Sequence, residues 1–362
     1  MLRYRKEKDY ISVFNESTGL YIRRGIDKNG MDTGLDPFMS SFPELLDVGI
    51  MGHCRNAVVC RNAGIECYQG GDDNKQPNMS VDDFAEIIRQ CRGKTYQIAL
   101  GGHGDPDEHD DFEEILKICK ENGIVPNFTT SGFSMTYEKA QLCKKYCGAV
   151  AVSWQRAEHT YKALETLLAT GVKTNIHYVI SNGSIDEAIE RLDKDSFYHG
   201  INAVVFLLHK PIGCGTKSSM VKIGDSRMDV FIKSAISKQH PYKIGFDSCT
   251  IPAILNNESD IDLDSIDTCE AARWSAYISP DMKMMPCSFD NRNMKWAVSL
   301  REYKIQEAWN SKQFEDFRNH LRKACMGCKD RQSCLGGCPI CPEIVLCKRT
   351  EKTLLVKEAA RP

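Results

Sequence analysis

Cysteine thiolates bind soft metals, and the 17 cysteines of this 362-residue chain are unevenly spaced. Near the C-terminus four of them follow the pattern C-x2-C-x5-C-x3-C, and two more come soon after. This group comprises Cys325, Cys328, Cys334, Cys338, Cys341 and Cys347. One structural zinc ion takes four ligands, so the group is too large for a single Zn²⁺. The spacing instead indicates iron–sulfur clusters, which cysteine thiolates hold.

Two smaller cysteine groups lie upstream. The first contains Cys54, Cys60 and Cys67, and the second contains Cys269 and Cys287. Three thiolates can hold a [4Fe–4S] cluster and leave its fourth iron open for a substrate or cofactor. A zinc loop in the first group and a pair of zinc ribbons in the tail are the alternatives.

A disulfide framework is disfavoured. The chain is long, its cysteine count is odd, and its charged N-terminus leads into no apolar stretch that would act as a signal peptide. We therefore expect a reducing, cytoplasmic setting with metal ligation as the purpose of the cysteines. The net charge of −2 gives no polybasic surface for nucleic acid, and no apolar run approaches the roughly 20 residues of a membrane helix.

The first cysteine group follows a predicted strand, and further strands alternate with helical stretches. The expected strands are Leu45–Ile50, Gln97–Leu100, Val125–Thr129, Ala149–Ser153, Lys173–Ile180 and Ala203–Leu208. Short strands alternating with helices predict a parallel sheet of βα units, either a partial barrel or a doubly wound sheet. In a barrel the carboxyl ends of the strands carry the active site.

The alternation of strands and helices ends after about residue 245, where a polar segment leads into the later cysteines. We expect an extended or hairpin segment at 1–43, the βα region at 44–245, a cysteine-organised domain at 246–350 and a tail at 351–362. A hairpin-like stretch from Cys269 to Cys287 and one helix near Ile305–Leu321 are expected in the third region.

Polar and glycine residues follow several of the expected strands. After the second strand comes Gly101-Gly102-His103-Gly104-Asp105-Pro106, where glycines would let the backbone approach a ligand closely. Thr129, Thr130, Ser131 and Gly132 end the third strand, Ser153 and Gln155 the fourth, and Asn175 lies on the fifth. Each alone is also compatible with an ordinary strand-to-helix turn.

Together these features resemble the radical S-adenosylmethionine (SAM) superfamily. Its members usually carry C-x3-C-x2-C after the first strand, with an aromatic residue beside the last cysteine. Here the spacing is C-x5-C-x6-C, and Tyr68 follows Cys67. His103 stands where the family's Gly-Gly-Glu-Pro motif has its acid, and Asp105 is the nearby acid. The resemblance implies SAM contacts from Tyr68, Gly101, Gly102, His103, Asp105, Thr130, Ser131, Ser153, Gln155 and Asn175.

The tail resembles the SPASM extension of the same superfamily, with Met282 at its usual glycine position. The resemblance implies a partial (β/α)6 TIM-like barrel, a small cysteine-rich C-terminal domain, and three [4Fe–4S] clusters and SAM as cofactors. Auxiliary cluster I would be held by Cys269, Cys287 and Cys338, with Cys249 or an open iron. Auxiliary cluster II would be held by Cys325, Cys328 and Cys334, with Cys347 or Cys341.

The implied activity is reductive cleavage of SAM to a 5′-deoxyadenosyl radical that abstracts a substrate hydrogen. Peptide maturation by a thioether or carbon–carbon crosslink is the first expectation, and small-molecule oxidation and sulfatase maturation are alternatives. Ser288 stands where sulfatase maturases carry an acid, so Asp290 is the nearest catalytic candidate. A flavodoxin or ferredoxin would donate electrons. About 43 residues precede the barrel, too few for the N-terminal leader-binding domain that many peptide-modifying relatives carry. Substrate recruitment would then need a separate peptide-recognition protein or the barrel mouth itself. The non-catalytic alternative is a zinc-ribbon-like binding protein.

The remaining cysteines and two histidines have simpler expectations. Cys91, Cys119, Cys143 and Cys147 lie on predicted helices and are expected in the core. Cys214, between Gly213 and Gly215, is expected in a loop at the barrel mouth. His177 and His209 are expected to be core or wall residues.

Overall fold

The structure, a computed structural model, describes residues 1–70, 75–257, 262, 265–331 and 333–347. The expected tail at 351–362 lies outside the described residues. Within them, no helix is long and apolar enough to cross a membrane.

A ten-stranded sheet forms the body of the protein, in the order β10-β9-β8-β7-β6-β5-β4-β11-β12-β13. All neighbouring pairs from β10 to β11 are parallel. The strands are β4 (Leu45–Met51), β5 (Gln97–Gly102), β6 (Val125–Thr130), β7 (Val150–Ser153), β8 (Thr174–Ile180), β9 (Ala203–Leu208), β10 (Lys243–Phe246), β11 (Ser275–Ile278), β12 (Lys283–Met285) and β13 (Val298–Ser299). The six predicted strands are confirmed as β4 to β9, and β10 adds a seventh parallel strand.

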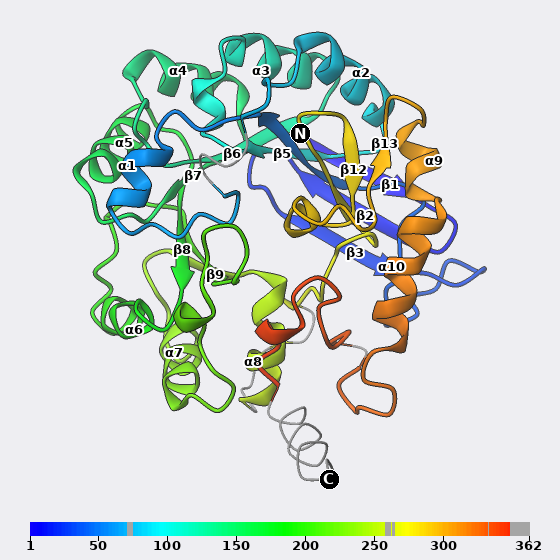
Figure 1. Cartoon of the computed structure of the whole chain (residues 1–362). Helices are drawn as coiled ribbons and strands as arrows, with labels where there is room; N and C mark the ends of the chain where they lie inside the picture. The colour runs from blue at the N-terminus through cyan, green and yellow to red at the C-terminus, as the bar shows by residue number, and fades with distance from the viewer. Residues whose placement is uncertain (71–74, 258–261, 263–264, 332, 348–362) are drawn as a thin grey trace.

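Helices connect the parallel strands and cover the outer face of the curved sheet (Figure 1). They are α1 (Ala57–Asn62), α2 (Val81–Cys91), α3 (Phe112–Glu121), α4 (Tyr137–Tyr146), α5 (Glu158–Ala169), α6 (Ile185–Asp193), α7 (Ser226–Ile236) and α8 (Ile251–Asn256). Helix α2 illustrates why they form: Ser80 caps its N-terminus, and its apolar residues recur every three or four positions on the face that is buried. Cys91, Cys119 and Cys143 are fully buried on α2, α3 and α4, so the expected core placement of these thiols is confirmed.

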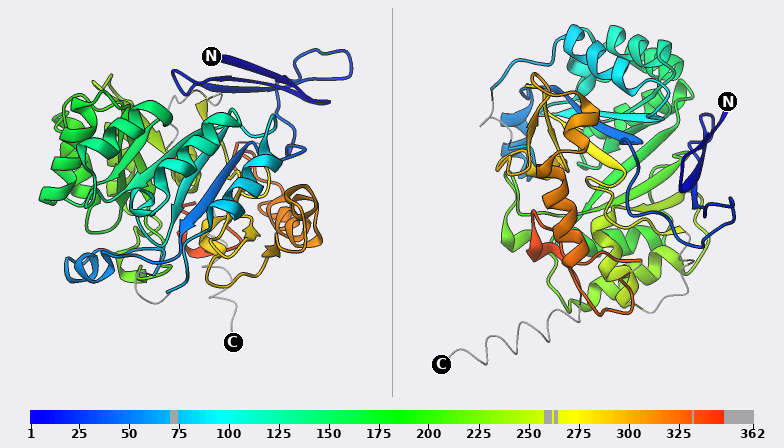
Figure 2. Two further views of the ribbon diagram at one scale, coloured as in Figure 1. Left: turned by 90° about the horizontal axis from the view of Figure 1, so that it is seen from above. Right: turned by 90° about the vertical axis from the view of Figure 1, so that its right-hand side faces the viewer.

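The N-terminal segment forms a separate three-stranded antiparallel sheet of β1 (Leu2–Lys6), β2 (Tyr10–Asn15) and β3 (Tyr21–Gly25). The sequence predicted the hairpin of β2 and β3 but missed β1. Alternate residues of β2, including Tyr10 and Phe14, are buried against the main body. Figure 2 shows this sheet at one end of the barrel and α1 at the other. The barrel end that carries the first cysteine group is therefore opposite the N-terminal sheet.

The cysteine-rich region continues the main sheet, because β11 pairs with β4 in parallel. Strands β11 and β12 form the hairpin expected between Cys269 and Cys287. The single helix expected near Ile305–Leu321 is instead two helices, α9 (Ile305–Trp309) and α10 (Lys312–Lys323). The break occurs because the Ser311 side chain accepts a hydrogen bond from the Phe314 N–H and caps a new helix.

Candidate metal centres and SAM site

The loop after β4 brings the first three cysteines together at the carboxyl end of the barrel strands. Cys60 lies on α1, while Cys54 and Cys67 lie on either side of that helix. Burial raises the pKa of the Cys54 thiol to about 11, and the charges of Asp105, Cys60 and Cys67 add to the rise. Four groups that act on one another in this way are close neighbours. Each of the three thiols stays partly exposed.

Glycines after β5 let this strand end pack against the cysteine loop. A Cβ on Gly102, which has φ of +119°, would lie 2.3 Å from the Met51 carbonyl oxygen. A Cβ on Gly104 would lie 2.6 Å from the carbonyl oxygen of His53. A Cβ on Gly101 would meet no heavy atom within 4 Å, so open space borders the backbone there. Both close contact with the loop and room for a ligand therefore depend on this glycine motif.

Asp105 joins the ends of β5 and β6. Its carboxylate accepts hydrogen bonds from the Ser131 N–H, at 2.8 Å, and from the Ser131 hydroxyl. Burial raises the pKa of Asp105 to about 7. Beyond β7, the Gln155 side chain forms a hydrogen bond with the Cys60 thiol that opposes the burial-driven rise in that thiol's pKa. The structure thus brings Asp105, Ser131 and Gln155 to the three cysteines.

Other predicted SAM contacts lie in different surroundings. His103 is 3% exposed, and its Nδ1 lies 3.0 Å from the Gln69 carbonyl oxygen, beneath the cysteine loop. Thr130 is fully buried and accepts a hydrogen bond from the Gly132 N–H. Ser153 is the last residue of β7. Asn175 is the second residue of the seven-residue strand β8 and pairs with Asn202 at 2.7 Å. Because the cysteines lie at the other end of the strands, the structure does not bring Asn175 to them.

Glu66 links the cysteine loop to the loop after β9, a connection that sequence reasoning missed. Its carboxylate accepts hydrogen bonds of 2.9 Å from both the Thr216 and Ser219 hydroxyls. The ring of His209 lies 3.4 Å from the same carboxylate, so this histidine is a wall residue, as expected. The sign of this connection in the sequence was the pair of glycines on either side of Cys214. Gly213 lets the loop after β9 approach the cysteine loop, because a Cβ there would lie 2.3 Å from the Tyr68 carbonyl oxygen.

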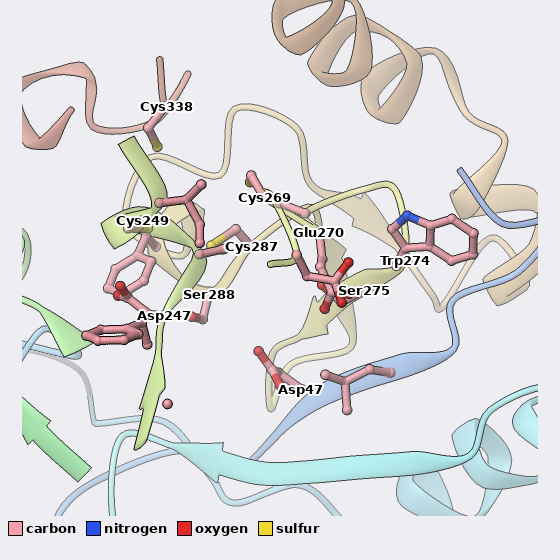
Figure 3. Close-up of a pocket in the computed structure, with 18 of the residues that line it drawn as sticks. Asp47, Asp247, Cys249, Cys269, Glu270, Trp274, Ser275, Cys287, Ser288 and Cys338 are labelled. Atoms are coloured by element: carbon pink, nitrogen blue, oxygen red, sulfur yellow. The ribbon is translucent and has the colours of Figure 1, made fainter. Parts of the chain in front are cut away.

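A cavity of about 790 Å³ opens inside the barrel and reaches the cysteine-rich region. Figure 3 shows thiols gathered at one end, with Asp47, Glu270 and Trp274 at the other. The thiols that line the cavity belong to Cys249, Cys269, Cys287, Cys338 and Cys341. Burial raises the pKa of the Cys269 thiol to about 11, and it also raises the pKa of the Cys249 and Cys287 thiols.

The four residues predicted for auxiliary cluster I form one electrostatic group in this cavity. The charges of Cys269 and Cys338 both act on Cys249 and on Cys287. Cys249 follows β10 and Cys287 follows β12, so the two sides of the barrel opening each supply ligands. Cysteine thiolates are the ligands that iron–sulfur clusters take, so this set of side chains fits such a cluster.

A second thiol group lies in the tail. Burial raises the pKa of Cys334, and the charges of Cys325, Cys347 and Cys328 add to the rise. Cys341 is 4% exposed and lines the cavity beside Cys338. The sequence left Cys341 and Cys347 open as the last ligand of auxiliary cluster II, and the structure groups Cys347 with the other three.

Neither group resembles a site for one metal ion. Among the residues that the structure describes, no three or more Cys, His, Asp or Glu side chains converge as a single ion would require. A [4Fe–4S] cluster takes each thiolate at a separate iron, so its ligands surround a space.

Asp290, the predicted catalytic candidate, is held in place by backbone amides. It is 1% exposed, and its two carboxylate oxygens accept hydrogen bonds from the N–H groups of Lys295, at 3.2 Å, and Trp296, at 3.0 Å. The nearby Phe289 is the side chain that reaches the first cysteine loop, where its ring centroid lies 4.9 Å from that of Tyr68. The two cysteine regions are thus in direct contact through aromatic rings.

Comparison with known proteins agrees with this geometry. Residues 269–330 match the SPASM family, described as an iron–sulfur cluster-binding domain. SuiB of Streptococcus suis bound to S-adenosylmethionine is similar with a TM-score of 0.70 at 14% identity, over 94% of each chain. SuiB bound to precursor peptide SuiA has a TM-score of 0.70 at 14% identity, over 94% of this chain and 96% of that one.

A third similar structure is anSMEcpe with bound S-adenosylmethionine, with a TM-score of 0.60 at 14% identity over 88% of this chain and 94% of that one. At such low identity these likenesses establish the fold, and the matched domain establishes the cluster-binding region. The chain therefore has the fold of these solved structures, and residues 269–330 carry a SPASM iron–sulfur cluster-binding domain.

Proposed function

We propose that this protein cleaves SAM reductively and uses the resulting radical to modify a peptide. The observation that carries the proposal is the meeting of three thiols, Cys54, Cys60 and Cys67, with Asp105 at the carboxyl end of the strands. These thiols would hold an iron–sulfur cluster with one open iron, and that cluster would supply the electron for reductive cleavage of bound SAM.

The chain's own residues hold and orient these groups. The three thiols of the loop after β4 hold the cluster. Asp105, kept in place by Ser131, would bind the amino group of SAM, and the open space beside the backbone of Gly101 would leave room for it. The loop after β9, tied down by Glu66, closes one side of the site.

The two thiol groups of the C-terminal region hold the auxiliary clusters. Cys249, Cys269, Cys287 and Cys338 surround the cavity, and Cys325, Cys328, Cys334 and Cys347 form the second site. The cavity joins the barrel interior to the first of these sites, so a substrate bound there lies next to a one-electron acceptor. A flavodoxin or ferredoxin is the proposed source of electrons.

A peptide is the proposed substrate, modified by a thioether or carbon–carbon crosslink. Support comes from SuiB, which shares this fold over nearly its whole length and has been observed with its precursor peptide SuiA. Sulfatase maturation is a weaker candidate, because Ser288 follows Cys287 and the next acid, Asp290, is engaged by backbone amides.

The test is anaerobic reconstitution of the full chain, followed by iron counting and incubation with SAM and dithionite. Three clusters correspond to about 12 irons per chain, and 5′-deoxyadenosine should form. A short peptide encoded beside the gene for this chain should then change in mass. The triple variant C54A/C60A/C67A should lose about four irons and all SAM cleavage, whereas Cys147→Ala should lose neither. Zinc in place of iron, or no 5′-deoxyadenosine, would refute the proposal.

A further inference from the structure

A buried ion pair borders the thiols of the cavity. Lys210 follows β9 and is only 7% exposed. Its ammonium donates hydrogen bonds to the Leu208 carbonyl oxygen at 2.9 Å and to the Asp247 carboxylate at 2.7 Å. A buried ammonium is costly unless it is paired and hydrogen-bonded, and both Asp247 and the Leu208 carbonyl oxygen serve Lys210 here.

Asp247 is itself fixed in place. One of its carboxylate oxygens accepts a hydrogen bond of 2.7 Å from the Thr250 hydroxyl. The other accepts one of 3.1 Å from the Leu208 N–H, in addition to the bond from Lys210. Because Lys210 and Asp247 follow the neighbouring parallel strands β9 and β10, the sheet itself sets their relative position.

Both charges act on the predicted ligands of auxiliary cluster I. Lys210 and Asp247 line the same cavity as Cys249, Cys287 and Cys338, and Figure 3 shows Asp247 beside Cys249 and near Cys287. Burial raises the pKa of the Cys249 thiol, while the charge of Lys210 opposes that rise. The Lys210 charge has the same effect on the Cys338 thiol.

The Lys210 ammonium also lies beside the aromatic contact between the two cysteine regions. Lys210 Nζ lies 4.6 Å from the ring centroid of Phe289, which in turn contacts Tyr68. Of its three N–H groups, two reach the oxygen acceptors described above. The charge is therefore held at the cavity wall and is not neutralised on every side by oxygen ligands.

We propose that Lys210 and Asp247 set the reduction potential of the auxiliary cluster held by Cys249, Cys269, Cys287 and Cys338. Net charge and hydrogen bonding near the sulfurs tune such potentials. The positive charge of Lys210 stabilises the cluster after it gains an electron and so raises its potential, whereas the negative charge of Asp247 lowers it. The inference rests on the proposed function for the presence of the cluster, and it adds the residues that tune it.

The experiment is a redox titration of the reconstituted full chain with dithionite and mediators, followed by electron paramagnetic resonance. Lys210→Met should lower the potential by about 59 mV, which is a tenfold change in the equilibrium constant of a one-electron reduction. Asp247→Asn should raise it by a similar amount. The double variant K210M/D247N should return towards the unmodified protein, and Lys210→Arg, which keeps the charge, should shift it little.

Opposite shifts from the two single variants distinguish an electrostatic role from general damage. The auxiliary signal is identified as the one lost in Cys287→Ser, and the signal that SAM perturbs serves as an internal reference that should stay unchanged. Equal potentials in all variants, or shifts of one sign in both single variants, would overturn the inference. If Lys210→Met fails to fold, Asp247→Asn must still raise the potential. If the unmodified protein gains no cluster at these thiols, the proposed function fails and the inference fails with it.

Discussion

The backbone N–H of Cys214 donates a hydrogen bond of 2.8 Å to the carbonyl oxygen of Cys67. Cys67 is the last thiol of the first cysteine group, and Cys214 lies in the loop after β9. The bond therefore joins the first and sixth βα units across the mouth of the barrel. It shows that the position of a cluster ligand depends on a loop far away in the sequence.

Gly213→Ala should disrupt this junction. Gly213 has φ of +70°, and a Cβ there would lie 2.3 Å from the Tyr68 carbonyl oxygen and 2.5 Å from that of Cys67. The loop must move away, so we expect the loss of about four irons per chain together with SAM cleavage. Iron counting and 5′-deoxyadenosine formation measure this.

Gly19→Ala is the matched control for Gly213→Ala. Gly19 has φ of +76° with no heavy atom within 4 Å of a Cβ, so it tests left-handed backbone strain alone. That strain should cost about 1–2 kcal/mol in urea unfolding and leave the iron content unchanged. Equal iron contents in the two variants would show that the contact with Cys67 is unimportant.

Cys347→Ser and Cys341→Ser should differ in iron content. Cys347 acts on Cys334 together with Cys325 and Cys328, whereas Cys341 lies at the cavity beside Cys338. Cys347→Ser should therefore destabilise auxiliary cluster II and lower the iron content by about four per chain. Cys341→Ser should retain all clusters. The reverse result would assign Cys341 as the ligand.

Substitution of Asp290 should affect stability and not chemistry. Asp290→Ala leaves the buried Trp296 N–H and the more exposed Lys295 N–H without their acceptor, which should cost about 2 kcal/mol in the free energy of unfolding. Asp290→Asn keeps one acceptor oxygen and should cost less. Both folded variants should form 5′-deoxyadenosine and convert substrate at the rate of the unmodified protein. An Asp290→Asn protein that is stable but inactive would restore the catalytic assignment.

His177 should make stability depend on pH. Burial lowers the pKa of His177 to about 4 in the folded protein, against about 6.5 for an unfolded histidine. Between these values the unfolded chain binds the extra proton, so stability is lost as the pH falls from about 6.5 to 4. His177→Gln should remove up to about 3 kcal/mol of this loss.

Urea unfolding at pH 7 and pH 4.5 measures the effect of His177. His199→Gln, at an exposed position, controls for the change from histidine to glutamine. A difference between His177→Gln and the unmodified protein that stays constant with pH would contradict the prediction.

Local patterns were enough to predict much of the fold. The strands β4 to β9 were predicted to within one or two residues, because buried parallel strands carry short apolar runs bounded by turn residues. Strand β1 was missed because three of its five residues are charged and none is buried, so its sequence has no apolar periodicity. The split between α9 and α10 was missed because Ser311 acts as a cap only once Phe314 begins a new turn.

The sequence predicted which residue types make up the candidate site, but it predicted only some of their roles. Cysteine spacing indicated clusters, because thiolates at short intervals along a chain are the ligands that iron–sulfur clusters take. The sequence could not tell Cys341 from Cys347, or an anchoring Asp290 from a catalytic one, since each choice depends on which side chains burial brings together.

Tertiary structure alone decided the contacts between distant segments. Glu66 meets Thr216, Cys214 meets Cys67, and Lys210 meets Asp247, and each pair is joined only when the parallel strands are aligned side by side. Local spacing predicted that the chain binds soft metal both at the barrel and in the cysteine-rich region. The curvature of the sheet decided which thiols share a cavity and which buried charges face them, because that curvature brings strand ends from remote parts of the sequence to one place.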